Sequence, residues 1–249
     1  MSGHSKWASI KHKKGATDAK RGKVFTKIIR EISIAARLGG GDQEANPRLR
    51  TAVLKAKISN MPKDNIDRAI KKGTGDLEGS NYVELTYEAY GPGGVAILVE
   101  ALTDNKNRTA AELRHILSRG GGNLGESGSV SYLFKRKGLI TFDASQYNED
   151  AILEVALEAG AEDVSSADGT IEVMTEPEDF EAVLQALEEA KFEHTSAEVS
   201  MIADAQVALA EDKTRQALRL IENLEDHDDV QSVATNLDIP EGFSLDDSD

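Results

Sequence analysis

The first 14 residues of the chain combine cationic side chains with its only tryptophan. The candidates for a ligand contact in this segment are Lys6, Trp7, Lys11, His12, Lys13 and Lys14. Ammonium groups neutralise phosphates, and an indole face can stack on an unpaired base or a ribose. The pattern therefore indicates a nucleic-acid contact, with the alternative that Trp7 pins this segment to the first helical domain.

A net positive charge extends from this segment through the residues that follow it. Residues 1–75 contain 18 Lys and Arg against 6 Asp and Glu, a net charge of +12, whereas the whole chain carries -15. By subtraction from the totals of 29 and 44, residues 76–249 hold 11 basic and 38 acidic side chains, or -27. Charge sorted in this way is typical of a domain that lies against a polyanion. The further candidate contacts are Lys20, Arg21, Lys23, Lys27, Arg30, Arg48 and Arg50.

Residues that could perform catalysis or hold a metal are scarce. The chain has no cysteine, and its five histidines show neither i, i+4 pairing nor a carboxylate at ligand spacing. No nucleophile, phosphate-loop or zinc-protease motif occurs, and most carboxylates fall on predicted helix surfaces. We therefore predict no metal, no cofactor and no catalytic residue, and we interpret the protein as not an enzyme.

A glycine-rich segment follows the middle of the chain. Gly120, Gly122 and Gly125 match the spacing G-x-G-x-x-G, but they follow a predicted helix where a dinucleotide fold needs a strand. We interpret residues 120–129 as a flexible connection whose exposed amides could meet a phosphate. The basic residues that flank it are Arg114, Arg119, Lys135, Arg136 and Lys137. These residues form either a second basic patch or ion pairs with acidic side chains nearby.

Three helices position the predicted cations in a domain that spans residues 1–78 and begins with a flexible arm. The first helix covers about 17–38, with an apolar stripe on one face and basic residues at spacings of three and four on another. Asn46 and Pro47 predict the N-cap and first turn of the second helix. The third helix is expected over 62–73, where Gly73 ends it.

The rest of the chain predicts two mixed units. Two β-rich runs, 82–90 and 95–103, flank a Gly-Pro-Gly-Gly turn and predict a hairpin, which a helix through residue 119 follows. Residues 139–202 predict the order β-α-β-β-α-β, which is the ferredoxin-like arrangement. A later helix and a strand at 230–235 cannot close a core alone, so we expect them to complete the sheet of the earlier hairpin.

These elements predict an α+β protein with an N-terminal three-helix domain, a discontinuous α/β middle domain and an inserted ferredoxin-like βαββαβ domain. The middle domain takes residues 79–134 and 204–239, and the acidic inserted domain takes 135–203. Residues 240–249 are expected to form an acidic mobile tail.

Several long blocks of the sequence resemble those of a known protein family. They read GHSKWASIKHKKGATDAKRGKVFTKIIREI, NMPKDNIDRAIKKGTG, YEAYGPGGVAILVEALTDNKNRTAAELRHI and GGNLGESGSVSYLF. Over essentially its whole length the chain resembles the YebC/PmpR family, whose mitochondrial relative is a translational activator of cytochrome c oxidase. The resemblance implies a three-domain α+β protein that binds nucleic acid and has no catalytic activity.

The resemblance and the charge distribution together predict a DNA-binding regulator of transcription. The alternative within the family is a translation factor that binds RNA on the ribosome, rRNA or tRNA, and relieves stalls at consecutive prolines. An alternative of another class is an adaptor whose acidic domains bind a basic protein. We expect a cytoplasmic protein with no membrane partner and no small-molecule substrate, because the aliphatic runs are far shorter than the roughly 18 residues of a membrane span and no secretory signal is recognisable.

Overall fold

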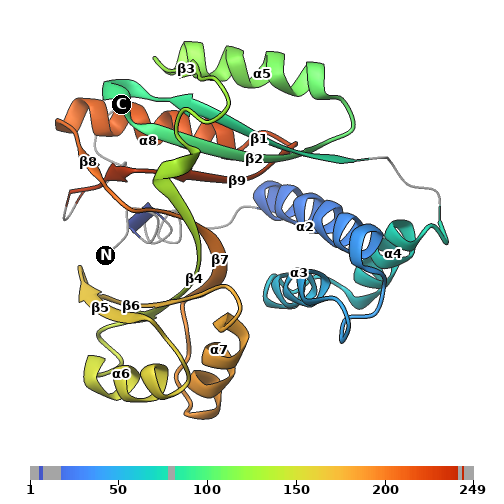
Figure 1. Ribbon diagram of the computed structural model, residues 1–249, viewed down its shortest axis with the longest axis vertical. Helices are drawn as coiled ribbons and strands as arrows, with labels where there is room; N and C mark the ends of the chain where they lie inside the picture. The colour runs from blue at the N-terminus through green and yellow to red at the C-terminus, as the bar shows by residue number, and fades with distance from the viewer. Residues whose placement is uncertain (1–5, 8–17, 78–81, 241–242, 244–249) are drawn as a thin grey trace.

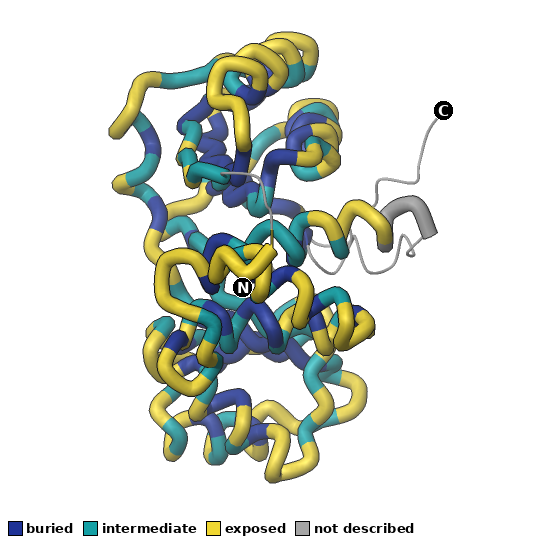
Figure 2. Tube along the Cα trace, turned by 90° about the vertical axis from the view of Figure 1, so that its right-hand side faces the viewer, coloured by how far each residue is buried: buried dark blue, intermediate teal, exposed yellow. Residues whose placement is uncertain are grey.

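The computed structural model describes residues 6–7, 18–77, 82–240 and 243, which form three units (Figure 1). Three helices of the N-terminal part lie beside two separate β-sheets, each of which is covered by its own pair of helices. Buried residues are concentrated inside each unit (Figure 2). Among the described helices, none is both long enough and apolar enough to cross a membrane.

The helical unit consists of α2 (Asp18–Gly39), α3 (Pro47–Ile58) and α4 (Lys63–Thr74). Its core is formed by the predicted apolar stripe of α2, including the fully buried Ile32, against residues of the other two helices such as Leu49. Asn46 caps α3 as predicted, because its side-chain oxygen accepts a hydrogen bond from the amide of Leu49 at 3.1 Å. The amide of the same side chain donates to the carbonyls of Ala35 and Gly40, both at 2.8 Å, and so joins the end of α2 to the start of α3.

The end of α4 differs from the prediction. The helix continues through Gly73 to Thr74, and Gly75 caps it in the left-handed conformation, with a φ of 90°. Gly73 has another role, because a Cβ at this position would lie 2.4 Å from the carbonyl oxygen of Ser33 in α2. The glycine therefore permits the close crossing of α4 over α2.

The middle unit contains β1 (Val83–Tyr90), β2 (Ala96–Thr103), α5 (Lys106–Arg119), the short β3 (Asn123–Leu124), α8 (Glu211–Glu225) and β9 (Val230–Thr235). A 3-10 turn, Pro92–Gly94, closes the predicted hairpin, and Asn105 caps α5. The strand order β3-β1-β2-β9 shows that the late strand completes the early hairpin, as predicted. Both helices cover one face of this sheet, where Leu113 of α5 and Ile221 of α8 are fully buried.

The inserted unit contains β4 (Phe134–Asp143), α6 (Glu149–Glu158), β5 (Asp163–Ala167), β6 (Thr170–Thr175), α7 (Phe180–Glu189) and β7 (Ser196–Ala203). Its antiparallel strands follow the ferredoxin-like order β5-β6-β4-β7, and both helices pack on one face around residues such as Phe142. The predicted fold class is therefore confirmed, while the exact domain boundaries stay a prediction.

Two features of the connections were not predicted. Strand β4 begins at Phe134, five residues before the predicted start at Leu139, after a 3-10 turn over Ser131–Leu133. Phe134 packs with Ala96, Leu98 and Ala234 on the face of the middle sheet that α5 and α8 leave open. Two short parallel strands, β8 (Val207–Ala208) and β10 (Leu237–Asp238), also connect the chain that enters α8 to the chain that leaves β9. The proposed tail lies outside the described residues from 241 onward, apart from residue 243.

We expect the substitution Gly73→Ala to lower the free energy of unfolding by about 1–3 kcal/mol, because the new methyl group would overlap the backbone of α2. The matched control is Gly22→Ala in α2, where a Cβ would meet nothing within 4 Å. This control should stabilise the helix by up to about 1 kcal/mol. Urea unfolding followed by circular dichroism measures both values, and equal stability of the two variants would contradict the close crossing.

Candidate nucleic-acid interface

The start of the chain is anchored to the middle unit. Trp7 is only 2% exposed and belongs to the core between the sheet and α8, where its indole nitrogen donates to both carboxylate oxygens of Glu225 at 3.2 and 3.1 Å. Lys6 donates to the carbonyl of Ile239 at 2.9 Å and pairs with Asp168 at 3.2 Å. Trp7 therefore serves as an anchor, as one of the two alternatives expected, but on the middle unit rather than on the helical one. In this arrangement it exposes no ring face for stacking.

Part of the predicted set lies outside the described residues. Lys11, His12, Lys13 and Lys14 fall in the segment 8–17. The backbone of α2 includes Lys20 and Arg21, but the structure does not describe their side chains. A phosphate contact by these six residues stays a prediction.

The basic face of α2 lies against the C-terminal end of α8. Lys23 donates to the carbonyl of Asp226 at 3.1 Å, and Lys27 donates to the carbonyl of Glu225. One turn further, Arg30 donates to the carbonyl of Asp228. The last carbonyls of a helix have no partner within the helix and carry a partial negative charge. Two of the predicted phosphate-binding cations, Lys23 and Lys27, thus satisfy the end of another helix, and Arg30 binds the turn that follows it.

Burial in this contact disfavours the charged form of Lys27. It lowers the pKa of Lys27 from the ordinary 10.5 to about 8, against the opposing effect of Glu225 and Asp226. The other end of the contact is more favourable, because Arg30 also donates to the carboxylate of Asp229 at 3.0 Å and lies 5.2 Å from the ring centre of Tyr82.

Asp229 is a buried anchor for two units, with only 4% of its side chain exposed. Besides Arg30, its carboxylate accepts hydrogen bonds from Arg108 at 2.8 Å, Thr109 at 2.7 Å and Thr103 at 3.1 Å. Burial would raise the pKa of Asp229, but these donors outweigh burial and hold the pKa below its usual range. The carboxylate is therefore ionised and joins the basic helix to the middle sheet.

Helix α3 makes the second part of the contact. Arg48 donates to Glu31 of its own unit at 2.8 and 3.2 Å and to Glu84 at the start of β1. These hydrogen bonds raise the pKa of Arg48 despite partial burial, which acts in the opposite direction. The Nε–H of Arg50 is shared between the two carboxylate oxygens of Glu181 in α7, at 3.0 and 2.7 Å. Of these contacts, only that of Arg48 with Glu31 uses two nitrogens of the planar guanidinium on the two oxygens of one carboxylate.

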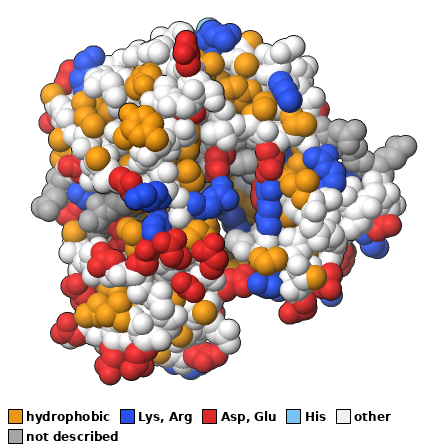
Figure 3. Space-filling view, in the orientation of Figure 1, with side chains coloured by type: hydrophobic (Ala, Val, Ile, Leu, Met, Phe, Trp, Pro, Cys, Tyr) orange, Lys and Arg blue, Asp and Glu red, His pale blue; other side chains and the backbone are white. Residues whose placement is uncertain are grey.

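We call this set of contacts the interdomain clasp. Its donors are Lys23, Lys27, Arg30, Arg48 and Arg50, and its acceptors are the carbonyls of Glu225, Asp226 and Asp228 and the carboxylates of Asp229, Glu84 and Glu181. Figure 3 shows blue basic and red acidic side chains close together where the helical unit meets the other two. Each predicted cation whose side chain the structure describes is thus paired with the protein's own groups.

A further set of cations was not among the predicted contacts. Five residues near the end of α3 and along α4 are exposed, and no ion pair to them occurs among the described residues: Lys57, Lys63, Arg68, Lys71 and Lys72. We call these the α4 cationic face, on which Asp64 and Asp67 are also exposed. The apolar spacing of α4 was the available signal for four of them, because it places Ile66 and Ala69 inward and so turns the cations of α4 to solvent.

The second predicted basic patch is largely paired. Lys135 pairs with Asp204 at 2.9 Å, and Arg136 pairs with Glu100 at 2.7 Å. Lys137 contacts both Glu162 and Glu176 at 2.7 Å. For these three residues the pairing alternative holds. Arg114 and Arg119 are exposed on α5.

The glycine-rich connection is held in place by a buried carboxylate. Strand β3 pairs with β1, and Glu88 of β1 accepts hydrogen bonds from the amides of Gly128, Val130 and Ser131 at 2.6, 2.6 and 2.8 Å. Burial would raise the pKa of Glu88, but these amides lower it overall. Within the predicted connection 120–129, the amide of Gly128 therefore already binds an internal anion and is not available to a phosphate, whereas the flexibility of the connection stays a prediction.

Two groups of titratable residues are candidates for a metal site or a catalytic site. Glu112, His227 and Asp229 place ligand atoms within 4.8 Å of one another. The Nδ1 atom of His227 accepts from the amide of Asp229 at 3.1 Å, so its Nε2 donates to Glu112 at 2.8 Å. Both ring nitrogens are thus used, and a cation would compete with Arg30 and Arg108 for Asp229.

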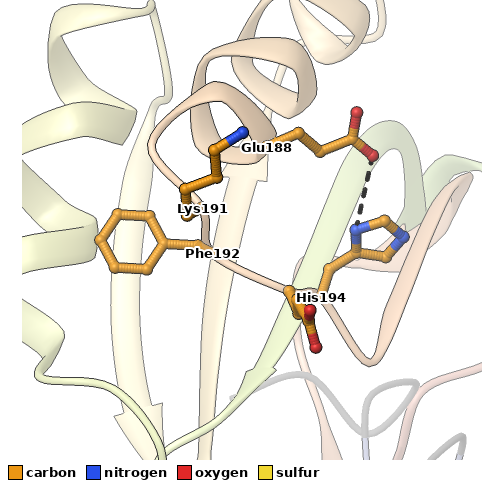
Figure 4. A pocket seen from close by; sticks show the side chains of 5 residues that line it. Glu188, Lys191, Phe192 and His194 are labelled. Atoms are coloured by element: carbon orange, nitrogen blue, oxygen red, sulfur yellow. Dashed lines mark ion pairs between the residues drawn. The ribbon is translucent and has the colours of Figure 1, made fainter.

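The other group lines a hollow after α7, formed by Glu188, Lys191, Phe192, Glu193 and His194 (Figure 4). His194 and Glu188 approach to 3.8 Å. All five residues come from a single helix-to-strand turn, and their charges are mixed, so the hollow brings together no set of groups with a shared catalytic task.

Comparison with known proteins matches the two parts of this architecture separately. Residues 5–76 match the family described as the TACO1/YebC protein N-terminal domain, and residues 82–237 match the TACO1/YebC second and third domain. The chain belongs to the TACO1/YebC family. The resemblance inferred from the sequence blocks is thereby confirmed.

Relatives in this family span nearly the whole chain. A protein of Treponema denticola named "Probable transcriptional regulatory protein" is 64% identical over 98% of this chain and 99% of its own length. A protein of the same name from Desulfosudis oleivorans is 60% identical over 95% and 96%. The crystal structure of the conserved hypothetical protein Aq1575 from Aquifex aeolicus has a TM-score of 0.81 at 48% identity, and the match covers 90% of this chain and 93% of that one.

The substitution Lys27→Met tests the burial of this lysine in the clasp. Between about pH 8 and 10.5 the unfolded chain keeps a proton on Lys27 that the folded protein has lost, so the lysine makes the folded state more stable as the pH rises through this window. We expect the stability of the wild type relative to the methionine variant to increase over that window in urea unfolding. A constant or falling difference would show that Lys27 is not buried against α8.

The substitution Glu88→Gln tests the anchored connection. An amide group in place of the carboxylate leaves some of the three backbone donors without an acceptor, which should cost about 2–4 kcal/mol of unfolding free energy. The matched control, Glu126→Gln, changes an exposed carboxylate of the same segment and should alter stability by less than about 0.5 kcal/mol. Thermal unfolding compares them, and equal effects would refute the anchoring role of Glu88.

Proposed function

We propose that this protein is a non-enzymatic regulator of gene expression that binds nucleic acid through the helical unit. The observation that carries the proposal is the α4 cationic face, whose five cations are exposed and have no ion pair among the described residues. Cations that serve only to dock domains would be expected to face the acidic units, as those of the clasp do. The α4 cationic face instead turns to solvent, where phosphates are the natural partners.

Transcription is the level of regulation that the relatives support. The curated relatives from Treponema and Desulfosudis carry the name of probable transcriptional regulatory proteins, and they align with this chain over its whole helical unit. We therefore propose DNA as the partner. The cationic side chains of the arm, together with Lys20 and Arg21, are proposed as additional phosphate contacts.

The composition of the α4 cationic face favours recognition of the backbone over reading of bases. Lysine binds a phosphate through its ammonium charge, and arginine binds it through paired N–H groups. Asp64 and Asp67 on the same helix would repel the phosphates on either side of a groove if the helix entered that groove to read bases. The acidic units keep their own surfaces away from the polyanion by like-charge repulsion. The helical unit is therefore expected to set both the orientation and most of the affinity.

A non-enzymatic role is consistent with the use of the reactive side chains. The buried carboxylates Glu88 and Asp229 act as acceptors for backbone amides and for arginine and threonine side chains. One of the histidines of the middle unit, His227, has both ring nitrogens in hydrogen bonds. We propose that these groups stabilise the fold rather than take part in turnover.

The triple substitution Arg68→Glu, Lys71→Glu and Lys72→Glu tests the proposed interface. On a mixed-sequence DNA duplex we expect affinity to fall at least about tenfold at roughly 50 mM salt, and the slope of log affinity against log salt to become shallower by about 1 for each lost phosphate contact. The matched control reverses Lys106, Arg114 and Arg119, which are exposed on α5. Fluorescence anisotropy measures both.

Equal losses in the two triple variants would reject α4 as the interface. Comparing a promoter duplex with a scrambled duplex distinguishes regulation of transcription from regulation of translation. A protein that reads a promoter should bind its own site more tightly than the scrambled duplex by a large factor. Equal affinity for all duplexes together with tighter binding of an RNA hairpin would move the proposal from DNA to RNA, and hence towards translation.

A further inference from the structure

The donors of the clasp on α2 have the geometry of a phosphate-binding row. Lys23, Lys27 and Arg30 lie at i, i+4 and i+7, so they share one face of the helix. At about 1.5 Å per residue they span roughly 10 Å along the axis. Successive phosphates of one DNA strand advance by about 3.4 Å along the duplex, so this row covers a few backbone steps.

In the clasp, the acceptors of these cations are oxygen atoms, as in a phosphate backbone, but most of them carry a smaller negative charge. Lys23 and Lys27 donate to backbone carbonyls at the end of α8, which carry only a partial charge. Phosphate oxygens carry a larger charge and form stronger hydrogen bonds with ammonium groups. A nearby nucleic acid would therefore be a better partner for these two lysines than the end of α8 is.

The remaining contacts of the clasp are mostly shallow. The side chains of Arg48 and Glu84 are 38% and 47% exposed, and those of Arg50 and Glu181 are 37% and 36% exposed. Ion pairs with this exposure typically change an equilibrium constant by about fivefold or less. Burial also disfavours the charged form of Lys27 while the clasp is closed. Only the contact of Arg30 with Asp229 is both buried and ionic.

We infer that the clasp is an autoinhibitory contact in which the end of α8 and the turn after it occupy a second nucleic-acid-binding face, formed by Lys23, Lys27 and Arg30. Nucleic acid held by the α4 cationic face competes for these cations, and its binding separates α2 from α8. Because binding and opening are coupled, the observed affinity is reduced by the fraction of molecules in which the clasp is closed. This inference rests on the proposed function and deepens it.

The first test loosens the clasp without touching any cation. Glu84→Gln with Glu181→Gln removes the negative charges of two acceptors and should tighten binding of the mixed-sequence duplex by between about twofold and thirtyfold. The matched control, Glu154→Gln with Glu158→Gln, removes the same number of exposed carboxylates from α6, away from the clasp. Any gain from net charge alone appears equally in both double variants.

A second step identifies the freed cations. Adding Lys23→Gln and Lys27→Gln to the loosened variant should abolish its gain, whereas in the wild type the same pair should have a much smaller effect, because these lysines contact α8 there. Circular dichroism spectra and unfolding midpoints check that each variant is folded.

The complementary test locks the clasp. The chain has no cysteine, so Arg50→Cys and Glu181→Cys can be joined by a short bismaleimide. The cross-linked protein should bind the duplex more weakly than the same double variant before cross-linking, with a shallower salt dependence.

The outcomes separate the inference from the proposed function. Duplex binding that is equal in the loosened, control and cross-linked proteins would overturn the clasp while leaving the proposed function intact. Binding by the loosened variant with little binding by the wild type would support both. If no variant binds the duplex or an RNA hairpin, the proposed function fails, and the inference fails with it.

Discussion

The attraction between a basic helical unit and two acidic units is the interaction on which the arrangement of this protein depends. Residues 1–75 carry +12 and the rest of the chain carries -27. The helical unit has its own core, so its contacts with the other units are made largely by side chains on its surface. Arg30 with Asp229 joins it to the middle unit, and Arg50 with Glu181 joins it to the inserted unit, where Leu54 of α3 also packs against the core. The charge asymmetry is therefore partly an internal property of the fold.

Buried anions supply the fixed points of this arrangement. A buried carboxylate is stable only where donors replace the water that it loses. Asp229 obtains these donors from α2, α5 and β2, whereas Glu88 obtains them from three backbone amides of a single connection. Asp229 therefore joins the helical and middle units, and Glu88 holds the connection through which the chain enters the inserted unit. Removing either side chain would leave donors without partners in a dry environment.

Much of the fold could be predicted from the sequence because its signals are local. Asn46 and Asn105 mark helix starts through hydrogen bonds that span three residues. The hairpin turn and the ferredoxin-like order likewise follow from turn chemistry and from the alternation of apolar residues. The end of α4 was misjudged because Gly73 is required by a close approach to α2, a contact that no local pattern reveals.

The candidate site was harder to predict because its partners are distant in the chain. Lys23 contacts a residue 203 positions away, and Trp7 contacts one 218 positions away. A basic helix looks the same in sequence whether its partner is a nucleic acid or the end of another helix. The cations of the α4 cationic face differ from those of the clasp only in their surroundings in the fold, which the sequence does not record.

Opening of the interdomain clasp on nucleic acid can be measured as a change in the distance between the helical and inserted units. Spin labels at Thr74→Cys in α4 and Ala182→Cys in α7 would report this distance by double electron–electron resonance in a chain with no other cysteine. We expect a single distance in the free protein and a shift to longer distances as a DNA duplex reaches saturation. An unchanged distance at saturating duplex would contradict the opening of the clasp.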